Sequence, residues 1–185
     1  MEYKIENYYF HHYKTEKCFG VYNSNSVSKE NFENFLIKRK KNHHFLSADQ
    51  YIKNIENNFL DPSNGIFLSF DDGYTDNLTI LLPILEKYNV PVTIFITSGF
   101  ILREYYPFEY ILSDILYANS VHDQQTKLEI YTDLRKQLKY LSYNDKIENL
   151  KHEFPNIDIN KFINKDLFLH SEQLKTISTS SLVTI

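Results

Sequence analysis

Two apolar runs on either side of a helical segment constrain the fold of this chain more than any other sequence feature. Residues 66–70 are apolar apart from one serine, as in a strand buried on both faces, and they end at Asp71 and Asp72. Residues 78–85 carry leucine and isoleucine at helical spacing, and residues 90–97 form the second apolar run. Strand, helix and strand joined by short turns form a βαβ unit, so the sequence predicts an α/β fold with parallel strands.

Composition excludes several classes of protein. The chain has 185 residues, which favours one domain or part of one, and 42% of them are hydrophobic, enough to form a core. The net charge of −4 argues against nucleic-acid binding, which usually needs a basic face, and a single cysteine excludes an internal disulfide. No segment approaches the roughly 18 apolar residues of a membrane span. The first residues also lack the apolar stretch of a signal peptide, so we expect a cytoplasmic protein.

Further elements are predicted around the βαβ unit. Aromatic residues at 8–13 favour a strand, residues 28–40 a helix, and residues 43–46 a short strand. Pro83 should kink the helix between the two apolar runs or delay its start, because proline lacks a backbone donor. Charged and aromatic residues from about 101 to 165 predict a helical insertion.

The sequence stops inside a further apolar run, residues 182–185, that is typical of a buried strand. Chain termini normally lie at the surface, so an end within a core strand favours a truncated domain. We therefore expect residues 1–185 to form a single, incomplete domain.

Asp71 and Asp72 are adjacent carboxylates at the carboxyl end of a predicted parallel strand, where sites of α/β folds collect. Two unpaired anions are costly to bury side by side, so a cation or a shared proton is implied. One carboxylate could bind a metal while the other takes a proton from water. The alternative is an ordinary surface turn, since Asp-Gly is common in turns.

Glycine is scarce, with only 4 residues in the chain, so each is expected to meet a backbone requirement. Gly73 and Gly99 each follow a predicted strand. We expect both to supply a positive φ or a close backbone approach near the two carboxylates.

The wider sequence around the carboxylates resembles the first motif region of the polysaccharide deacetylases, the NodB-homology family. The matching segments are Ser69-Phe70-Asp71-Asp72-Gly73-Tyr74, Asp76-Asn77, residues 82–88 and residues 90–96. Weaker resemblance extends upstream through Phe10-His11 and resumes at residues 169–185 as a short helix and the next strand.

This resemblance implies an irregular parallel (β/α) barrel that hydrolyses acetyl groups, N-acetyl more often than O-acetyl, on a sugar or polysaccharide. Asp71 would be the general base that activates water, and Asp72 would bind a divalent metal, usually zinc. The metal would polarise the acetyl carbonyl and stabilise the oxyanion. The backbone of the site and the bound substrate would be supported by Gly73, Tyr74 and Gly99.

The metal-ligand set implied by the resemblance is incomplete in this sequence. The family adds a His-x-x-x-His pair shortly after a strand like residues 182–185, and no such pair occurs in the chain. Catalytic zinc sites require three protein ligands, so the chain alone is expected to be inactive. The adjacent pair His11 and His12 should face opposite ways on a strand. His11 is the best remaining candidate ligand, because its strand should end near the mouth of the barrel.

Two other classes of function stay open. A non-catalytic carbohydrate-binding or interaction protein would have kept the fold and lost the site. A magnesium phosphohydrolase also places aspartates after an apolar strand, but such enzymes usually space them Asp-x-Asp, unlike Asp71 and Asp72.

Overall fold

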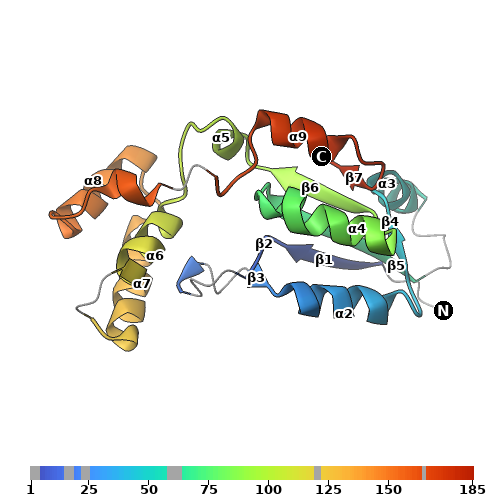
Figure 1. Cartoon of the computed structure of the whole chain (residues 1–185), viewed down its shortest axis with the longest axis horizontal. Helices are drawn as coiled ribbons and strands as arrows, with labels where there is room; N and C mark the ends of the chain where they lie inside the picture. Colours follow the sequence, from blue (N-terminus) through green and yellow to red (C-terminus); the bar gives the residue numbers. More distant parts are fainter. Residues whose placement is uncertain (1–4, 15–18, 22–25, 58–63, 119–121, 164–165) are drawn as a thin grey trace. The chain divides into compact units, whose positions relative to one another are not determined.

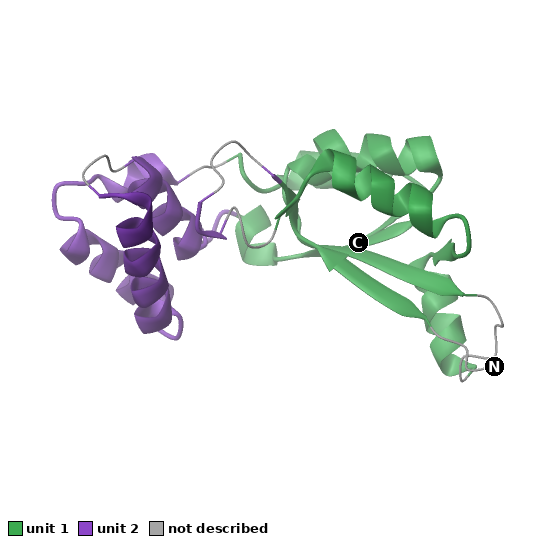
Figure 2. Cartoon of the chain, turned by 90° about the horizontal axis from the view of Figure 1, so that it is seen from below, with its two compact units in different colours: residues 1–13, 26–102, 166–185 green, residues 14–25, 103–165 purple. Residues whose placement is uncertain are grey.

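The chain divides into two compact units, one α/β and one helical (Figure 2). Unit 1 consists of residues 1–13, 26–102 and 166–185, and unit 2 of residues 14–25 and 103–165. The computed structural model describes residues 5–14, 19–21, 26–57, 64–118, 122–163 and 166–185. The larger part of unit 2 coincides, within two residues at its start, with the helical insertion expected from the sequence.

A parallel sheet forms the centre of unit 1 (Figure 1). Its strands are β1 (Glu6–Phe10), β4 (His44–Leu46), β5 (Gly65–Asp72), β6 (Val92–Ile96) and β7 (Val183–Thr184). The order is β1-β5-β6-β7, with β4 also paired to β5, and every pairing is parallel. A separate parallel pair joins β2 (His12–Tyr13) to β3 (Ser26–Val27). The predicted α/β class with a parallel sheet is therefore confirmed.

Strand β5 has neighbours along both edges. On one edge β1 pairs with residues 66–70 of β5. Strand β4 pairs with residues 65–67 and β6 with residues 69–72, and both overlap the stretch that β1 covers. Because one residue cannot pair twice on the same edge, β4 and β6 must follow one another along the opposite edge. The carboxyl end of β5 thus lies between the ends of β1 and β6.

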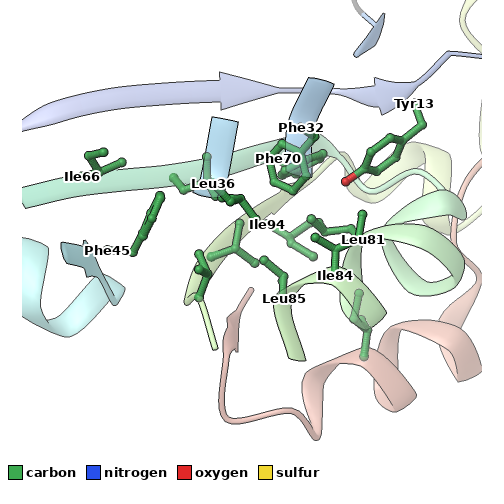
Figure 3. Packing of buried hydrophobic residues seen from close by; sticks show 14 of the residues in the cluster. Tyr13, Phe32, Leu36, Phe45, Ile66, Phe70, Leu81, Ile84, Leu85 and Ile94 are labelled. Carbon is green, nitrogen blue, oxygen red and sulfur yellow. The ribbon is translucent and has the colours of Figure 1, made fainter. Parts of the chain in front are cut away.

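The hydrophobic core of unit 1 lies between the sheet and its helices (Figure 3). The helices of unit 1 are α2 (Lys29–Arg39), α3 (Ala48–Glu56), α4 (Leu82–Tyr88), α5 (Ser98–Ile101) and α9 (Ser171–Ser178), and all of them except α3 contribute residues to this core. Alternate residues of β5 point into the core with no exposed surface, and they meet equally buried residues of α2, of α4 and of the segment just before α4. This set contains Ile66, Leu68, Phe70, Phe32, Leu36, Leu81 and Leu85. Each such side chain contributes about 1.5–3 kcal/mol by leaving water.

The two helices that precede β5 are capped at their N-termini by side chains. The hydroxyl of Ser28 accepts a hydrogen bond from the Asn31 amide at 3.1 Å, so α2 begins where the sequence predicts. Ser47 and Gln50 form a reciprocal capping box at the start of α3.

The helix between β5 and β6 changes its hydrogen-bond pattern before Pro83. Residues Asn77–Leu81 form a π-helical segment, η1, in which the Leu82 amide reaches back to the Asn77 carbonyl. Helix α4 then begins at Leu82, with Pro83 in its first turn, where a missing amide donor costs little. The expected delay of the regular helix is confirmed.

Unit 2 consists of helices packed on a leucine- and isoleucine-rich core. They are α6 (Phe108–Ala118), α7 (Gln124–Leu138), α8 (Tyr143–Glu153) and the 3-10 helix η2 (Ile159–Phe162). Ile111, Leu112, Ile115 and Leu116 of α6 have no exposed surface. In neither unit is any described helix long and apolar enough to cross a membrane.

Candidate functional site

Asp71 and Asp72 lie at the carboxyl end of β5, as the sequence predicts, and both are half-buried. In the sheet they are level with Phe95 and Ile96 of β6. We call residues 71–74 the carboxylate turn, because the chain leaves the sheet there.

The backbone of the carboxylate turn is left-handed at two successive residues. Asp72 has a φ of 71° and Gly73 a φ of 73°. A residue with a side chain seldom adopts this conformation, so Asp72 is held there by its surroundings. At Gly73 an added Cβ would also come within 3.1 Å of Ile96 Cγ2. The positive φ expected at Gly73 is present.

Gly99 does not share this conformation, so a positive φ, the first of the two roles expected for it, is wrong. It lies in α5, whose first residue Ser98 follows β6 after only Thr97, and its φ is not positive. The sequence signal was a glycine after a strand. The early start of a helix gives the same spacing without requiring a left-handed backbone.

Three side chains converge on the carboxylate of Asp72. His11 Nδ1 lies 3.3 Å from Oδ2, and the Tyr74 hydroxyl donates to the same oxygen at 3.4 Å. The Thr97 hydroxyl donates to Oδ1 at 3.1 Å. These groups follow β1, β5 and β6 respectively, so the ends of three neighbouring strands build the site. Thr97 was not singled out from the sequence, although a polar residue just after a predicted strand could have indicated it.

The two carboxyl groups are shifted in opposite directions. Burial raises the pKa of Asp71, and the nearby charge of Asp72 adds to that rise, although His11 partly offsets it. Burial would also raise the pKa of Asp72, but hydrogen bonds from His11, Thr97 and Tyr74 outweigh it and hold that pKa below its usual value. Adjacent carboxyls with diverging pKa values are typical of an acid–base site.

His11 and His12 have different surroundings, as the alternation of a strand predicts. The hydrogen bond to Asp72 raises the pKa of His11 above its ordinary value, despite partial burial. His12 is only 2% exposed, and its Nδ1 lies 2.9 Å from the Tyr13 carbonyl oxygen. Burial lowers the pKa of His12, which favours a neutral ring. Only His11 of this pair contacts Asp72.

Tyr74 supports the site through its hydroxyl while its ring is buried. The residue is 3% exposed, and its ring centroid lies 4.9 Å from that of His12 and 4.8 Å from that of Phe168. The segment containing Phe168 also bonds to the carboxylate turn, because the Leu169 amide donates to the Gly73 carbonyl at 2.9 Å. A stretch almost 100 residues further along the chain therefore braces the turn.

A metal ion would find a partial ligand set at this site. Asp72 and His11 offer oxygen and nitrogen donors 3.3 Å apart. Two ligands of a tetrahedral zinc, each at about 2.1 Å, are about 3.4 Å apart, so this spacing suits one ion. However, the described parts of the chain contain no group of three His, Cys, Asp or Glu residues that could hold a metal. Donor type and spacing fit, whereas ligand number does not.

Comparisons with known proteins connect the site to one family. A protein-family model described as polysaccharide deacetylase matches residues 61–152. No curated protein matches the chain significantly. A solved de-N-acetylase from Aggregatibacter actinomycetemcomitans is 19% identical, with a TM-score of 0.53, over 99% of this chain and 53% of that chain.

Two further solved structures show weaker similarity. The Streptococcus pyogenes deacetylase PplD, solved in complex with acetate, is 20% identical at a TM-score of 0.45, over 72% of this chain and 53% of that one. The BpsB deacetylase domain from Bordetella bronchiseptica is 16% identical at a TM-score of 0.47, over 98% and 52%. Neither TM-score is high enough to support a conclusion about the fold.

The chain spans about half the length of these solved structures. At 19% identity, the similarity to the de-N-acetylase concerns the fold alone. The family match itself covers β5, the carboxylate turn, η1, α4 and β6, which together carry both carboxylates. The chain therefore belongs to the polysaccharide deacetylase family.

Proposed function

We propose that the site around Asp71 and Asp72 hydrolyses acetyl groups on a sugar or polysaccharide. The observation that carries the proposal is the pair of adjacent carboxyls at the carboxyl end of β5, whose pKa values move in opposite directions. Family membership indicates the reaction class. No family match of this kind supports the alternative of a magnesium phosphohydrolase.

Asp71 would be the general base. Burial raises the pKa of Asp71 toward neutral pH. A base accepts a proton from water most effectively when its pKa is near the working pH. The activated water would attack the acetyl carbonyl carbon, and the bond from that carbon to the sugar nitrogen would break. The products are acetate and the free amine, which takes up the proton.

Asp72 and His11 would be the ligands that this chain offers to a divalent metal, with zinc the best match to one oxygen and one nitrogen donor. When bound, such an ion polarises a carbonyl oxygen. At least one more ligand would have to come from outside the described residues. Thr97 and Tyr74 would keep the carboxylate of Asp72 ionised and oriented.

An N-acetylated sugar is the proposed substrate. The structural relative from Aggregatibacter actinomycetemcomitans is described as a de-N-acetylase. An amide is also the more demanding bond, for which a buried base and a polarising cation are both useful. An O-acetyl ester is the second candidate.

A non-catalytic carbohydrate-binding protein is the alternative, favoured by the incomplete ligand set of the described residues. The test uses a form of the protein that supplies the further metal ligand. It measures acetate release from N-acetylated and O-acetylated oligosaccharides, with and without added zinc, together with binding of the same oligosaccharides. The proposed function predicts zinc-dependent release, faster from the N-acetylated compound. Binding without any acetate release would instead support the alternative.

A further inference from the structure

The position of His11 is not fixed by the sheet. Pairing between β1 and β5 ends at Phe10 and Phe70, one residue before His11. The next strand, β2, pairs with β3 and not with β5. Tyr13, its last residue, is also the last residue of unit 1 before the chain passes into residues 14–25. Backbone pairing therefore stops just where the histidine must be held against Asp72.

Asp76 links this segment to the carboxylate turn. The Tyr13 amide donates to Asp76 Oδ2 at 2.6 Å, across 63 residues of sequence. Asp76 lies four residues after Asp72, at the start of η1. Its other oxygen, Oδ1, accepts a hydrogen bond from Asn77 Nδ2 at 3.2 Å, and Asn77 has no exposed surface. Both oxygens of this carboxylate are thus held in place.

We propose that Asp76 is a positioning residue that keeps His11 against Asp72. It contacts neither residue. It bonds the backbone two residues beyond His11 and anchors that backbone to the turn that carries Asp72. The inference rests on the proposed function only for the role of His11 in the site. In structural terms, the distance between the side chains of His11 and Asp72 depends on Asp76.

The same segment has other contacts, which make the inference testable. The ring of Tyr13 is buried near Phe32 and Phe70, with centroids 5.9 Å and 6.1 Å away, and His12 contacts Tyr74. These contacts hold side chains on either side of the amide that Asp76 binds. If they suffice, loss of the Asp76 carboxylate will leave His11 in place.

The experiment measures how fast diethyl pyrocarbonate modifies His11 in the full chain, with the site identified by peptide mass spectrometry. Asp76→Ala should raise the rate at least about fivefold, because a released segment exposes the imidazole more often. Asp76→Asn keeps a carbonyl oxygen for the Tyr13 amide and should stay within about twofold of wild type. Asp123→Ala is the matched control, since it removes a carboxylate–amide hydrogen bond in unit 2, and it should leave the rate unchanged.

Thermal unfolding of each variant shows whether the fold is intact. If Asp76→Ala does not fold, Asp76→Ser replaces it with the same expected rise, because serine stays polar but its hydroxyl is one bond closer to the backbone than the carboxylate oxygens that reach the Tyr13 amide. An unchanged His11 rate in a folded variant without the carboxylate would overturn the proposal. So would a rise in Asp76→Asn equal to that in Asp76→Ala. Neither outcome depends on acetate release, so failure here is separable from failure of the proposed function.

Discussion

At the scale of single residues, the site depends on contacts that bring distant parts of the chain together. Asp71 and Asp72 were predictable because two acidic residues directly follow an apolar strand. The contacts of Thr97 and Asp76 were not, because their partners lie 25 and 63 residues away and no local pattern records such pairs. The same limitation left His11 as one candidate ligand among several histidines.

Gly73 should tolerate no side chain. Gly73→Ala places a Cβ on a backbone with φ of 73° and 3.1 Å from Ile96 Cγ2. We expect a loss of about 1–3 kcal/mol in the free energy of unfolding, measured by urea denaturation. The control is Asn89→Gly, at the C-cap of α4 with a φ of 47°, which should be neutral or slightly stabilising. Equal stability of Gly73→Ala and wild type would contradict the assigned strain.

Asp76 should make stability depend on pH. Burial raises its pKa to about 7. The unfolded carboxyl ionises near pH 4, so stability from this group is present at lower pH and is lost as pH rises through about 7. Asp76→Asn cannot ionise. Its stability relative to wild type should therefore increase between about pH 5 and pH 8, by up to about 3 kcal/mol.

The control for this pH effect is Asp123→Asn. Asp123 is exposed, and a hydrogen bond from the Thr126 amide lowers its pKa, so it is ionised in both folded and unfolded chains across this range. The stability of Asp123→Asn relative to wild type should not change between the two pH values, as followed by thermal unfolding. A flat difference for Asp76→Asn as well would show that Asp76 ionises normally.

At the scale of helices and strands, the elements with strong periodic or apolar signals were predicted best. Strand β5 contains the first apolar run, β6 lies within the second, and α2 begins at the predicted cap. The two-residue strands β2 and β3 could not be predicted as a pair, because so short an element has no period. The placement of β4 and β6 along one edge of β5 was also beyond sequence patterns, since register depends on packing between elements.

Helix α3 should depend on its cap more than α2 does. None of the α3 residues is buried, whereas α2 buries Phe32 and Leu36 in the core. Ser47→Ala removes the capping box and should cost about 1 kcal/mol, which is about fivefold faster amide hydrogen exchange within α3. Ser28→Ala should show a smaller local effect in α2, because core packing holds that helix. No acceleration in α3 would mean that other contacts fix it.

At the scale of the whole molecule, the sequence predicted an α/β unit with a helical insertion and the family to which the chain belongs. The carboxylates were identifiable because they share one short motif. The remaining partners of the site come from three strand ends and from a segment beyond the insertion. Their convergence is a property of the folded sheet, which explains why sequence patterns located the centre of the site but not its surroundings.

The division of roles between Asp71 and Asp72 is tested most directly by one paired measurement on Asp71→Asn and Asp72→Asn. Both variants are made in a form of the protein that supplies the further metal ligand. Zinc binding is followed by titration calorimetry, and acetate release from an N-acetylated oligosaccharide is followed in the same samples. Asp71→Asn should bind zinc like wild type and release acetate at least about 100-fold more slowly, whereas Asp72→Asn should lose zinc binding. Acetate release by Asp71→Asn at the wild-type rate, or undiminished zinc binding by Asp72→Asn, would contradict the proposed roles.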